Sequence, residues 1–336
     1  MNESSNKIKI GIIGCSKIAK KSVLNAINDS QYAEIGAIGS RNIEKSIEFC
    51  NLFNCKLFGT YEDVINDKTI DLVYISLPNS LHEEWSIKAA RKGKHVWVEK
   101  PSTISFESAK KMVSICNKNN VRLFEGFMFR YHPQQKIVKD LINNGTIGDL
   151  LKFHGVYSFP MPDKMSNLLR KDLGGGSLND SASYPIYASR MLFGEEPISV
   201  FSNFSIDPIS GVDKIVDVLL KYSNGKTATI STAFGSYYQC NYTVIGSKAR
   251  LILNKAYVVP KTMKTIVSID INDEIKDVNV EVADHFKLMI DDFCLEIMKK
   301  KKYENFENDL LSQARVLEAA RISFKENRPV MLNEII

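Results

Sequence analysis

Three side chains in distant parts of the chain could together exchange a proton with a substrate oxygen. Lys100 lies in "EKP", directly after the short apolar stretch His95–Val98. Asp180 and Tyr184 lie in "GGGSLNDSASY", where their spacing of four puts both on one face of a helix. An ammonium, a carboxylate and a phenol can bind a hydroxyl or keto oxygen and serve it as acid or base. The pattern predicts acid–base chemistry on such an oxygen.

A purely structural explanation of the second segment is also open. Gly174–Gly176 could be a flexible loop, and Asp180 could be the N-terminal cap of the helix that follows. The functional hypothesis differs in one respect, because a run of glycines lets the backbone come close to a bulky ligand.

The first third of the chain predicts a framework that would position Lys100. Apolar and amphipathic stretches alternate, with strands expected at Ile8–Ile13, Glu34–Ile38, near Leu57, Leu72–Ser76, His95–Val98 and Arg122–Gly126, and helices at Ile18–Ile27, Ile43–Phe53, Leu81–Arg91 and Phe106–Asn117. This alternation predicts an α/β fold with a doubly wound parallel sheet. Ligands of such sheets bind beyond the carboxyl ends of the strands, where Lys100 stands.

The turn after the first strand, "GIIGCSKIA", resembles a dinucleotide-binding loop. Gly14, Ser16 and Ala19 occupy the three positions of G-x-G-x-x-G/A, so serine replaces the middle glycine. The motif alone is a weak signal. Its place between the first strand and the first helix favours binding of a pyrophosphate at the helix N-terminus.

The end of the second strand indicates which dinucleotide is preferred. An NAD site normally has an acidic residue there, whereas this chain has Ser40 and Arg41, with Lys45 one helical turn later. An exposed loop arginine would be the structural explanation. Absence of the acid and presence of the base favour NADP(H), with NAD(H) as the weaker alternative.

After residue 127 the pattern changes and predicts an α+β domain with a mostly antiparallel open sheet of about six strands. Strands are expected at Leu151–Phe159, Ile198–Ile206, Val216–Tyr222, Lys226–Phe234, Asn241–Gly246 and Ala249–Leu253, with two more beside the turn Asn272–Glu274, and helices at Gln134–Asn143, Asp284–Lys299 and Asn308–Lys325. "SNGK" predicts a hairpin. We therefore expect a Rossmann domain over residues 1–126 and a second domain over 127–336.

Composition excludes several other classes of protein. The 336 residues are 44% hydrophobic and 25% charged, with a net charge of +5, which is typical of a soluble globular protein. The basic run at 299–302 predicts a solvated helix end rather than a nucleic-acid site. The start is no signal peptide and no apolar run reaches membrane length. Six cysteines without CxxC and five scattered histidines predict a cytoplasmic protein without a metal site.

Taken in order, "GIIGCSKIA", "SRNIEK", "LPNSLH", "EKP", "GFMFRYHP" and "GGGSLNDSASY" resemble the glucose–fructose oxidoreductase, inositol dehydrogenase and rhizopine-catabolism (Gfo/Idh/MocA) family. The resemblance covers nearly the whole chain and implies catalysis by Lys100, Asp180 and Tyr184, with a cis bond between Lys100 and Pro101. It implies cofactor contacts by Gly14, Cys15, Ser16, Ile18, Ala19, Ser40, Arg41, Lys45, Leu77, Pro78, Asn79, His82, Glu99 and Lys100. Candidate substrate contacts are Arg130, His132, Arg170, Asp180 and Tyr184.

The resemblance implies an NADP(H)-dependent oxidoreductase that transfers a hydride between nicotinamide and a sugar carbon. The tyrosine at position 184 is similar to that of sugar 3-ketoreductases acting on nucleotide-linked deoxysugars. A dehydrogenase of a free sugar, polyol or dihydrodiol, a nucleotide-sugar oxidase using NAD, and a sensor without activity remain alternatives. Retention of Lys100, Asp180 and Tyr184 favours an enzyme. Whether Lys100 or Tyr184 donates the proton stays open, and a homodimer or homotetramer formed through the second sheet is expected.

Overall fold

The computed structural model describes residues 7–299 and 305–336 and divides into two compact units. The first unit is formed by the chain up to Met128 and by Phe286–Leu311, and the second by Phe129–His285 and Ser312–Ile336. The sequence places the segment Phe286–Leu311 in the second domain, whereas its contacts lie in the first unit. Most of the lysine run at 299–302 lies outside the described residues.

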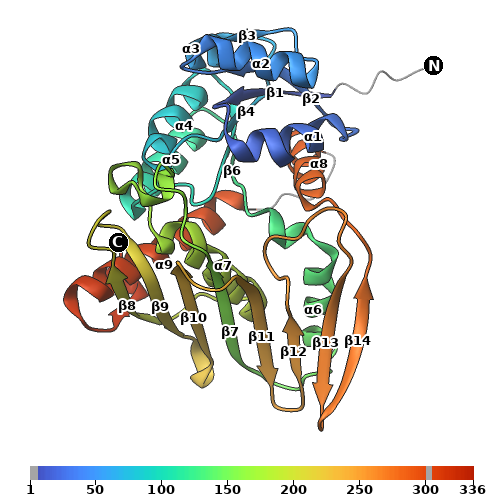
Figure 1. Cartoon of the computed structure of the whole chain (residues 1–336), viewed down its shortest axis with the longest axis vertical. Helices are drawn as coiled ribbons and strands as arrows, with labels where there is room; N and C mark the ends of the chain where they lie inside the picture. Colours follow the sequence, from blue (N-terminus) through green and yellow to red (C-terminus); the bar gives the residue numbers. More distant parts are fainter. Residues whose placement is uncertain (1–6, 300–304) are drawn as a thin grey trace. The chain divides into compact units, whose positions relative to one another are not determined.

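The first unit contains a six-stranded sheet in the order β3-β2-β1-β4-β5-β6 (Figure 1). Its strands are β1 (Ile8–Ile13), β2 (Ala33–Gly39), β3 (Phe58–Gly59), β4 (Leu72–Ile75), β5 (His95–Val98) and β6 (Leu123–Glu125). Every pairing is parallel. This confirms the predicted doubly wound sheet, whose strand order reverses between β1 and β4, where such folds bind their ligands.

Three of the helices in this unit begin at a residue whose side chain caps the helix. The helices are α1 (Leu24–Asn28), α2 (Ile43–Phe53), α3 (Tyr61–Asn66), α4 (His82–Arg91), α5 (Phe106–Lys118) and α8 (His285–Ile297). Asn42, Thr60 and Ser105 accept backbone N–H groups at the starts of α2, α3 and α5. A π-helical segment, η1 (Ala19–Val23), precedes α1, which the apolar pattern alone does not reveal.

Aromatic packing and an ion cluster attach α8 to the parallel sheet. The ring of Phe293 stacks on Phe124 at 4.4 Å and meets the edge of Trp97 at 5.9 Å. The guanidinium of Arg122 donates to Glu307 at 2.8 Å and to Glu296, and both carboxylates are nearly buried. These contacts explain why a segment so late in the chain belongs to the first unit.

The second unit contains a nine-stranded sheet in the order β14-β13-β12-β11-β7-β10-β9-β8-β15, in place of about six strands (Figure 1). The strands are β7 (Leu150–Phe159), β8 (Ser199–Ile206), β9 (Asp213–Lys221), β10 (Thr227–Phe234), β11 (Gln239–Gly246), β12 (Arg250–Leu253), β13 (Thr265–Ile271), β14 (Glu274–Val280) and β15 (Val330–Met331). Only β7 and β10 pair in parallel, which confirms a mostly antiparallel sheet.

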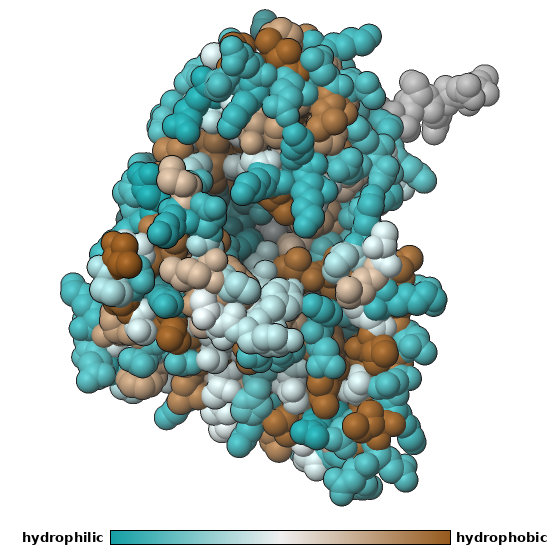
Figure 2. Space-filling model, viewed as in Figure 1, coloured by the Kyte–Doolittle hydropathy of each residue, from teal (hydrophilic) through white to brown (hydrophobic). Residues whose placement is uncertain are grey.

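Helices cover one face of this sheet. They are α6 (Pro133–Asn143), α7 (Ser183–Phe193) and α9 (Phe306–Glu326), the last of which contributes residues to both units. Along β10, Ala228, Ile230 and Phe234 are buried while Thr229 and Ser231 are exposed, as expected of a sheet covered on one side. In the face that Figure 2 shows, apolar side chains are interspersed with polar ones.

The hairpin between β9 and β10 forms at "SNGK" as predicted, with Asn224 at φ +53°. Within residues 7–299 and 305–336, none of the helices is long and apolar enough to cross a membrane.

Candidate active site

The turn after β1 has the backbone that a phosphate-binding loop requires. Gly14 has φ +101°, and a Cβ there would lie 2.9 Å from Leu77 and 3.1 Å from the carbonyl oxygen of Ser76. The Ser76 Oγ donates to the Gly14 carbonyl at 2.9 Å, and the Gly14 N–H donates to Gly39 at 3.0 Å. Only glycine fits here, because both the backbone angle and the neighbouring strand end exclude a side chain.

Ser16, which replaces the middle glycine of the motif, caps the helix that follows. Its Oγ accepts the N–H of Ala19 at 3.1 Å, and its carbonyl accepts the N–H of Lys20 at 3.1 Å. Serine therefore caps the first helix, next to Ile18, whose backbone is already helical. The departure from the glycine pattern has a local structural reason.

The turn after β2 lies against the phosphate loop. The Cys15 Sγ donates to the Lys45 carbonyl at 3.7 Å. Burial raises the pKa of Cys15, while a hydrogen bond with Ser40 and the charge of Lys45 act in the opposite direction. Arg41 lies beside the hydroxyl of Tyr61, whose pKa burial raises and Arg41 lowers. The structure thus brings four predicted cofactor residues to one place, together with Tyr61, which the sequence analysis did not select.

His82 joins the segments that follow β4 and β5. Its Nε2 lies 2.8 Å from the Leu77 carbonyl and its Nδ1 lies 3.0 Å from the Pro101 carbonyl. Burial lowers the pKa of His82 to about 4, so the ring is neutral at pH 7 and its single N–H donates to one of these two carbonyls. The sequence predicts a cofactor contact for His82; the structure gives its ring nitrogens backbone partners, so it fixes the loops from which Leu77, Pro78 and Asn79 come.

Lys100 stands at the carboxyl end of β5, and its bond to Pro101 is cis. The preceding Glu99 accepts a hydrogen bond from Tyr74 of β4 at 2.7 Å. Burial raises the pKa of Glu99, opposed by the Tyr74 hydrogen bond and the charge of Lys100. Glu125 at the end of β6 accepts the Ser102 N–H at 2.7 Å. Two acidic side chains thus hold the segment on either side of Lys100.

These strand ends fit a dinucleotide. The turn that follows Gly14 and the capped helix start offer backbone N–H groups for a pyrophosphate, and Arg41 and Lys45 offer positive charge where a ribose phosphate would lie. The residues that end β2 and follow it, Gly39, Ser40 and Arg41, include no carboxylate that would repel this phosphate.

In the second unit, Asp180 and Tyr184 lie on one continuous helix. It starts as a π-helix, η6 (Leu178–Ala182), and continues as α7. Both side chains lie close enough to Tyr157 of β7 to affect its pKa. Burial raises this pKa, and electrostatic interaction with Tyr184 and Asp180 raises it further. The ring of Tyr184 lies 5.5 Å from Tyr157 and 5.9 Å from Tyr257. The structure therefore brings Asp180 and Tyr184 together, as their spacing predicts.

Sequence reasoning did not select Tyr157 and Tyr257 for this cluster. Tyr157 lies within a predicted strand, and only the alternation of that strand could have indicated which way it points. Tyr257 lies in an irregular segment after β12, for which the sequence gives no period. Tyr157 lies beside both Asp180 and Tyr184, and Tyr257 lies beside Tyr184, through tertiary packing that the sequence does not show.

Family models match both parts of the chain. The model described as "Oxidoreductase family, NAD-binding Rossmann fold" matches residues 8–127, and the Gfo/Idh/MocA C-terminal domain matches residues 136–252. The chain belongs to the Gfo/Idh/MocA family. It is an oxidoreductase on the fold that the sequence predicts.

Similar proteins reduce or oxidise sugars. A dTDP-3,4-didehydro-2,6-dideoxy-alpha-D-glucose 3-reductase of Actinomadura kijaniata is 29% identical over 96% of this chain and 97% of its own. A D-xylose 1-dehydrogenase (NADP(+)) of Haloferax volcanii is 28% identical over 96% and 99%. The crystal structure of a 3-ketoreductase from A. kijaniata with NADP and TDP-benzene has a TM-score of 0.91 at 30% identity, covering 95% of this chain and 98% of that one. Variants of that ketoreductase with a tyrosine or a lysine replaced have also been solved.

The remaining predicted substrate contacts of this Gfo/Idh/MocA chain have partners within the second unit. Arg130 donates to the Tyr187 hydroxyl at 2.7 Å, and Arg170 pairs with Asp172 through two hydrogen bonds of 2.8 and 2.6 Å. His132 is buried at the start of α6, where its Nδ1 accepts the Gln134 N–H. These roles are structural, and contact with a substrate stays a prediction for all three.

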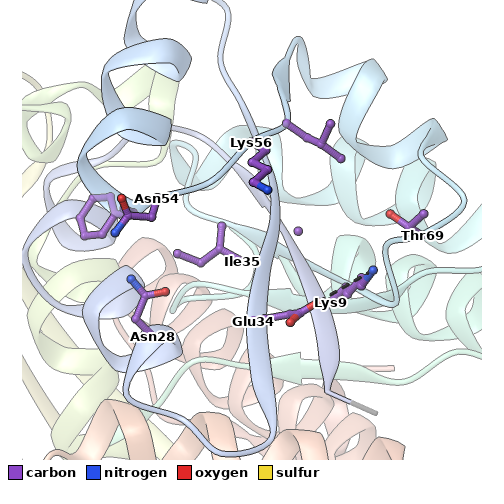
Figure 3. A pocket seen from close by; sticks show the side chains of 10 residues that line it. Lys9, Asn28, Glu34, Ile35, Asn54, Lys56 and Thr69 are labelled. Carbon is purple, nitrogen blue, oxygen red and sulfur yellow. Dashed lines mark ion pairs between the residues drawn. The ribbon is translucent and has the colours of Figure 1, made fainter. Parts of the chain in front are cut away.

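A groove at the opposite end of the parallel sheet is not part of this site. It is lined by Lys9, Asn28, Glu34, Ile35, Gly36, Phe53, Asn54, Lys56, Leu57 and Thr69 (Figure 3). Lys9 and Glu34, which pair at 3.9 Å, lie at the amino ends of β1 and β2. Ligands of doubly wound sheets bind at the carboxyl ends.

Among the described residues, no group of histidine, cysteine and acidic side chains could hold a metal ion.

Proposed function

We propose that the chain is an NADP(H)-dependent 3-ketoreductase of a nucleotide-linked deoxysugar. The observation that carries the proposal is the pairing of Asp180 and Tyr184 on one helix start, in a chain that also has Lys100 at the carboxyl end of β5. The likeness to the dTDP-sugar 3-reductase over nearly the full length of both chains supports the substrate class.

In this proposal, Lys100 and Tyr184 act on the oxygen of the reacting sugar carbon. When bound, the nicotinamide supplies the hydride for reduction or accepts it for oxidation. Lys100 stabilises negative charge on the oxygen, and the Tyr184 hydroxyl delivers the proton. Asp180 binds a neighbouring sugar hydroxyl or orients Lys100. The replaced tyrosine and lysine of the A. kijaniata ketoreductase support the choice of these residue types.

NADP(H) is the proposed cofactor, with Arg41 and Lys45 on the ribose phosphate and the backbone from Gly14 to Ala19 on the pyrophosphate. Two relatives whose descriptions name NADP support this assignment. Cys15, Ser16, Ile18, Ser40, Leu77, Pro78, Asn79 and Glu99 complete the proposed surroundings.

The direct test is reduction of a dTDP-linked 3-ketosugar, generated in situ by a dehydratase, with NADPH oxidation followed at 340 nm. We expect turnover with the ketosugar and NADPH, and little with NADH. No NADPH oxidation under these conditions contradicts the proposal.

A second candidate is an NADP-dependent dehydrogenase of a free aldose, which the likeness to the H. volcanii xylose dehydrogenase favours. The two candidates are separated by offering NADP with a panel of free aldoses, including D-xylose. A kcat/KM for a free aldose above that for the nucleotide-linked sugar favours the second candidate.

We also propose that the chain forms a homodimer or homotetramer through the second sheet. Leu151, Phe201 and Ile215 on β7, β8 and β9 are 42%, 37% and 40% exposed, which supports a partner for this sheet. Sedimentation at micromolar concentration tests it, and a monomer there contradicts it.

A cytoplasmic location is supported by six cysteines present as free thiols.

A further inference from the structure

The start of the helix that carries Asp180 is held by side chains from other elements. The glycine loop, residues 174–177, leads directly into η6. The Ser177 Oγ lies 2.9 Å from the Thr232 Oγ1 of β10. Asn179 donates to the Gly174 carbonyl at 3.0 Å and accepts from Arg321 of α9 at 2.7 Å. The conformation of residues 174–179 therefore depends partly on side chains from β10 and α9.

The closest support comes from Asp213, the first residue of β9. Its Oδ2 accepts the Leu178 N–H at 2.5 Å, and the Ser177 N–H also favours the carboxylate. Gly176 has φ +112°, and a Cβ on it would lie 2.2 Å from the Asp213 Oδ1. The glycine is needed because the carboxylate occupies the space of a side chain. Asp213 thus caps, from a distant strand, N–H groups that lack partners at a helix start.

We propose that Asp213 is a positioning residue, whose carboxylate holds the backbone N–H groups of Leu178 and Ser177 so that Asp180 and Tyr184 are presented to the substrate. The inference rests on the proposed function, in which Asp180 and Tyr184 act on the sugar. It adds a residue 33 positions from Asp180 in the sequence. Without this anchor the first turn of η6 loses a partner for its N–H groups, and the two side chains lose their fixed direction.

The chemistry of the anchor requires an ionised carboxylate. Three backbone N–H donors face it, and an ionised carboxylate has acceptors only, whereas a protonated acid or an amide turns a donor toward one of them. Burial raises the pKa of Asp213 to about 6, opposed by the amides of Leu178, Asp213 and Ser177 and by the charge of Arg321. Arg321 is itself paired with Glu318 on α9. Burial therefore disfavours ionisation of Asp213, whereas the N–H groups at the start of η6 require the ionised form.

The variant that tests this anchor is Asp213→Asn, which keeps the shape and removes the charge. Displacing catalytic groups by about 1 Å can cost up to ~10²-fold in rate, so we expect kcat for the ketosugar to fall about 10- to 100-fold at pH 7.5. NADPH affinity should be unchanged. The wild-type kcat should fall as the pH drops through about 6, and this step should be absent from the variant.

Asp207→Asn is the matched control. Asp207 lies in the same hairpin, where its Oδ2 accepts the Ser210 N–H at 2.8 Å and serves only that turn. We expect kcat within twofold of wild type and an unchanged pH profile. If Asp207→Asn lowers kcat as much as Asp213→Asn, the effect is a general loss of hairpin stability and the proposal is overturned.

A second measurement does not depend on the substrate. The hydrogen-exchange protection factor of the Leu178 amide should fall at least tenfold in Asp213→Asn, because the carboxylate that accepts this N–H is lost. Unchanged protection in the variant overturns the proposal, as does wild-type kcat in the variant. If the wild type reduces no ketosugar, the proposed function fails, while the exchange of Leu178 still decides the role of Asp213. If the variant does not fold, the pH dependence of wild-type kcat decides it.

Discussion

The two units hold their candidate site residues by different means. In the first, the residues stand in turns after parallel strands and are held by partners at the neighbouring strand ends. Some of these partners are backbone groups, as in the pairing of Gly14 with Gly39, and some are side chains, as in the bond from Tyr74 to Glu99. In the second, Asp180 and Tyr184 stand on a helix start that side chains of β9, β10 and α9 hold. The first arrangement follows from sheet topology, and the second depends on individual side chains far away in the sequence.

The difference indicates where substitutions can change the reaction. In a doubly wound sheet, the point where the strand order reverses forms a ligand site through its backbone. Changing side chains in the turns of the first unit should therefore alter cofactor preference and leave the binding site in place. In the second unit, a change in a supporting side chain moves the groups proposed to act on the substrate. We therefore expect reaction specificity to vary more through the second unit than through the first.

The largest expected effect comes from replacing one proposed catalytic group from each unit. Lys100→Met and Tyr184→Phe should each lower kcat about 10²–10⁴-fold, because each removes a group that stabilises charge or delivers a proton. NADPH affinity, measured by fluorescence titration, should stay nearly unchanged. If the two act on one oxygen, the double variant should lose little more than either single variant.

A control for this prediction lies just before β5. Lys94 precedes β5 and donates to the carbonyls of Asp67 and Ile70, so Lys94→Met should lower stability and leave kcat unchanged. Near-normal turnover in Tyr184→Phe would show that Lys100 works without it. Strictly multiplicative losses in the double variant would mean that the two units contribute independently.

The contribution to folding stability should change with pH in opposite directions for one buried residue of each unit, His82 and Asp213. His82 of the first unit is fully buried, and its pKa falls from 6.5 to about 4 in the folded chain. The unfolded state then binds more protons between these pH values, so stability is lost as the pH falls below 6.5. Each pKa unit corresponds to about 1.4 kcal/mol, which gives roughly 3 kcal/mol between pH 7.5 and 4.

The measurement for His82 is the free energy of urea unfolding at several pH values, in the wild type and in His82→Gln. The advantage of the wild type should shrink on acidification. Asp213 of the second unit has the opposite sign, because its raised pKa means that ionisation opposes folding as the pH rises toward 6. Parallel stability curves for wild type and His82→Gln would refute the buried neutral state of His82.

The sequence predicts the first unit better than the second, for the same physical reason. Buried parallel strands such as Ile8–Ile13 are continuous apolar runs, and their order in the chain fixes their carboxyl ends on one edge. Lys100 and Arg41 could therefore be placed without a structure. The π-helical turn at Leu178–Ala182 has no such signal, because its start depends on Asp213 and Arg321.

Two further differences have particular causes. The segment Phe286–Leu311 reads as an ordinary amphipathic stretch, and only its packing on Trp97 and Phe124 assigns it to the first unit. His82 lies in a motif that faces the cofactor edge, yet the burial that turns its ring toward two carbonyls is a tertiary property. Periodicity reports which face of an element is buried and says nothing of such partners.

A smaller effect is expected for cofactor preference, which belongs to the first unit. A hydrogen bond to a charged group contributes about 1.5–3 kcal/mol, so Arg41→Asp should lower the NADPH-to-NADH ratio of kcat/KM about 10- to 100-fold. Part of the change comes from lost affinity for the phosphate and part from repulsion by the new carboxylate. Arg91→Asp, at the exposed end of α4, is the control and should leave the ratio unchanged. Equal use of NADH by the wild type would contradict the assignment of Arg41.

The smallest expected effect concerns Ser16, where the chain departs from the glycine pattern. Its Oγ caps the first helix through the Ala19 N–H, and replacing a capping serine by glycine costs only a few tenths of a kcal/mol. Ser16→Gly should therefore lower Tm slightly and change the Kd for NADPH less than about threefold, because backbone donors remain for the pyrophosphate. Ser16→Ala, which keeps a Cβ and loses the cap, should cost about 1 kcal/mol. A tenfold tighter Kd in Ser16→Gly would instead mean that the serine side chain crowds the pyrophosphate. Pyrophosphate binding at this turn would then depend on a side chain as well as on the backbone geometry.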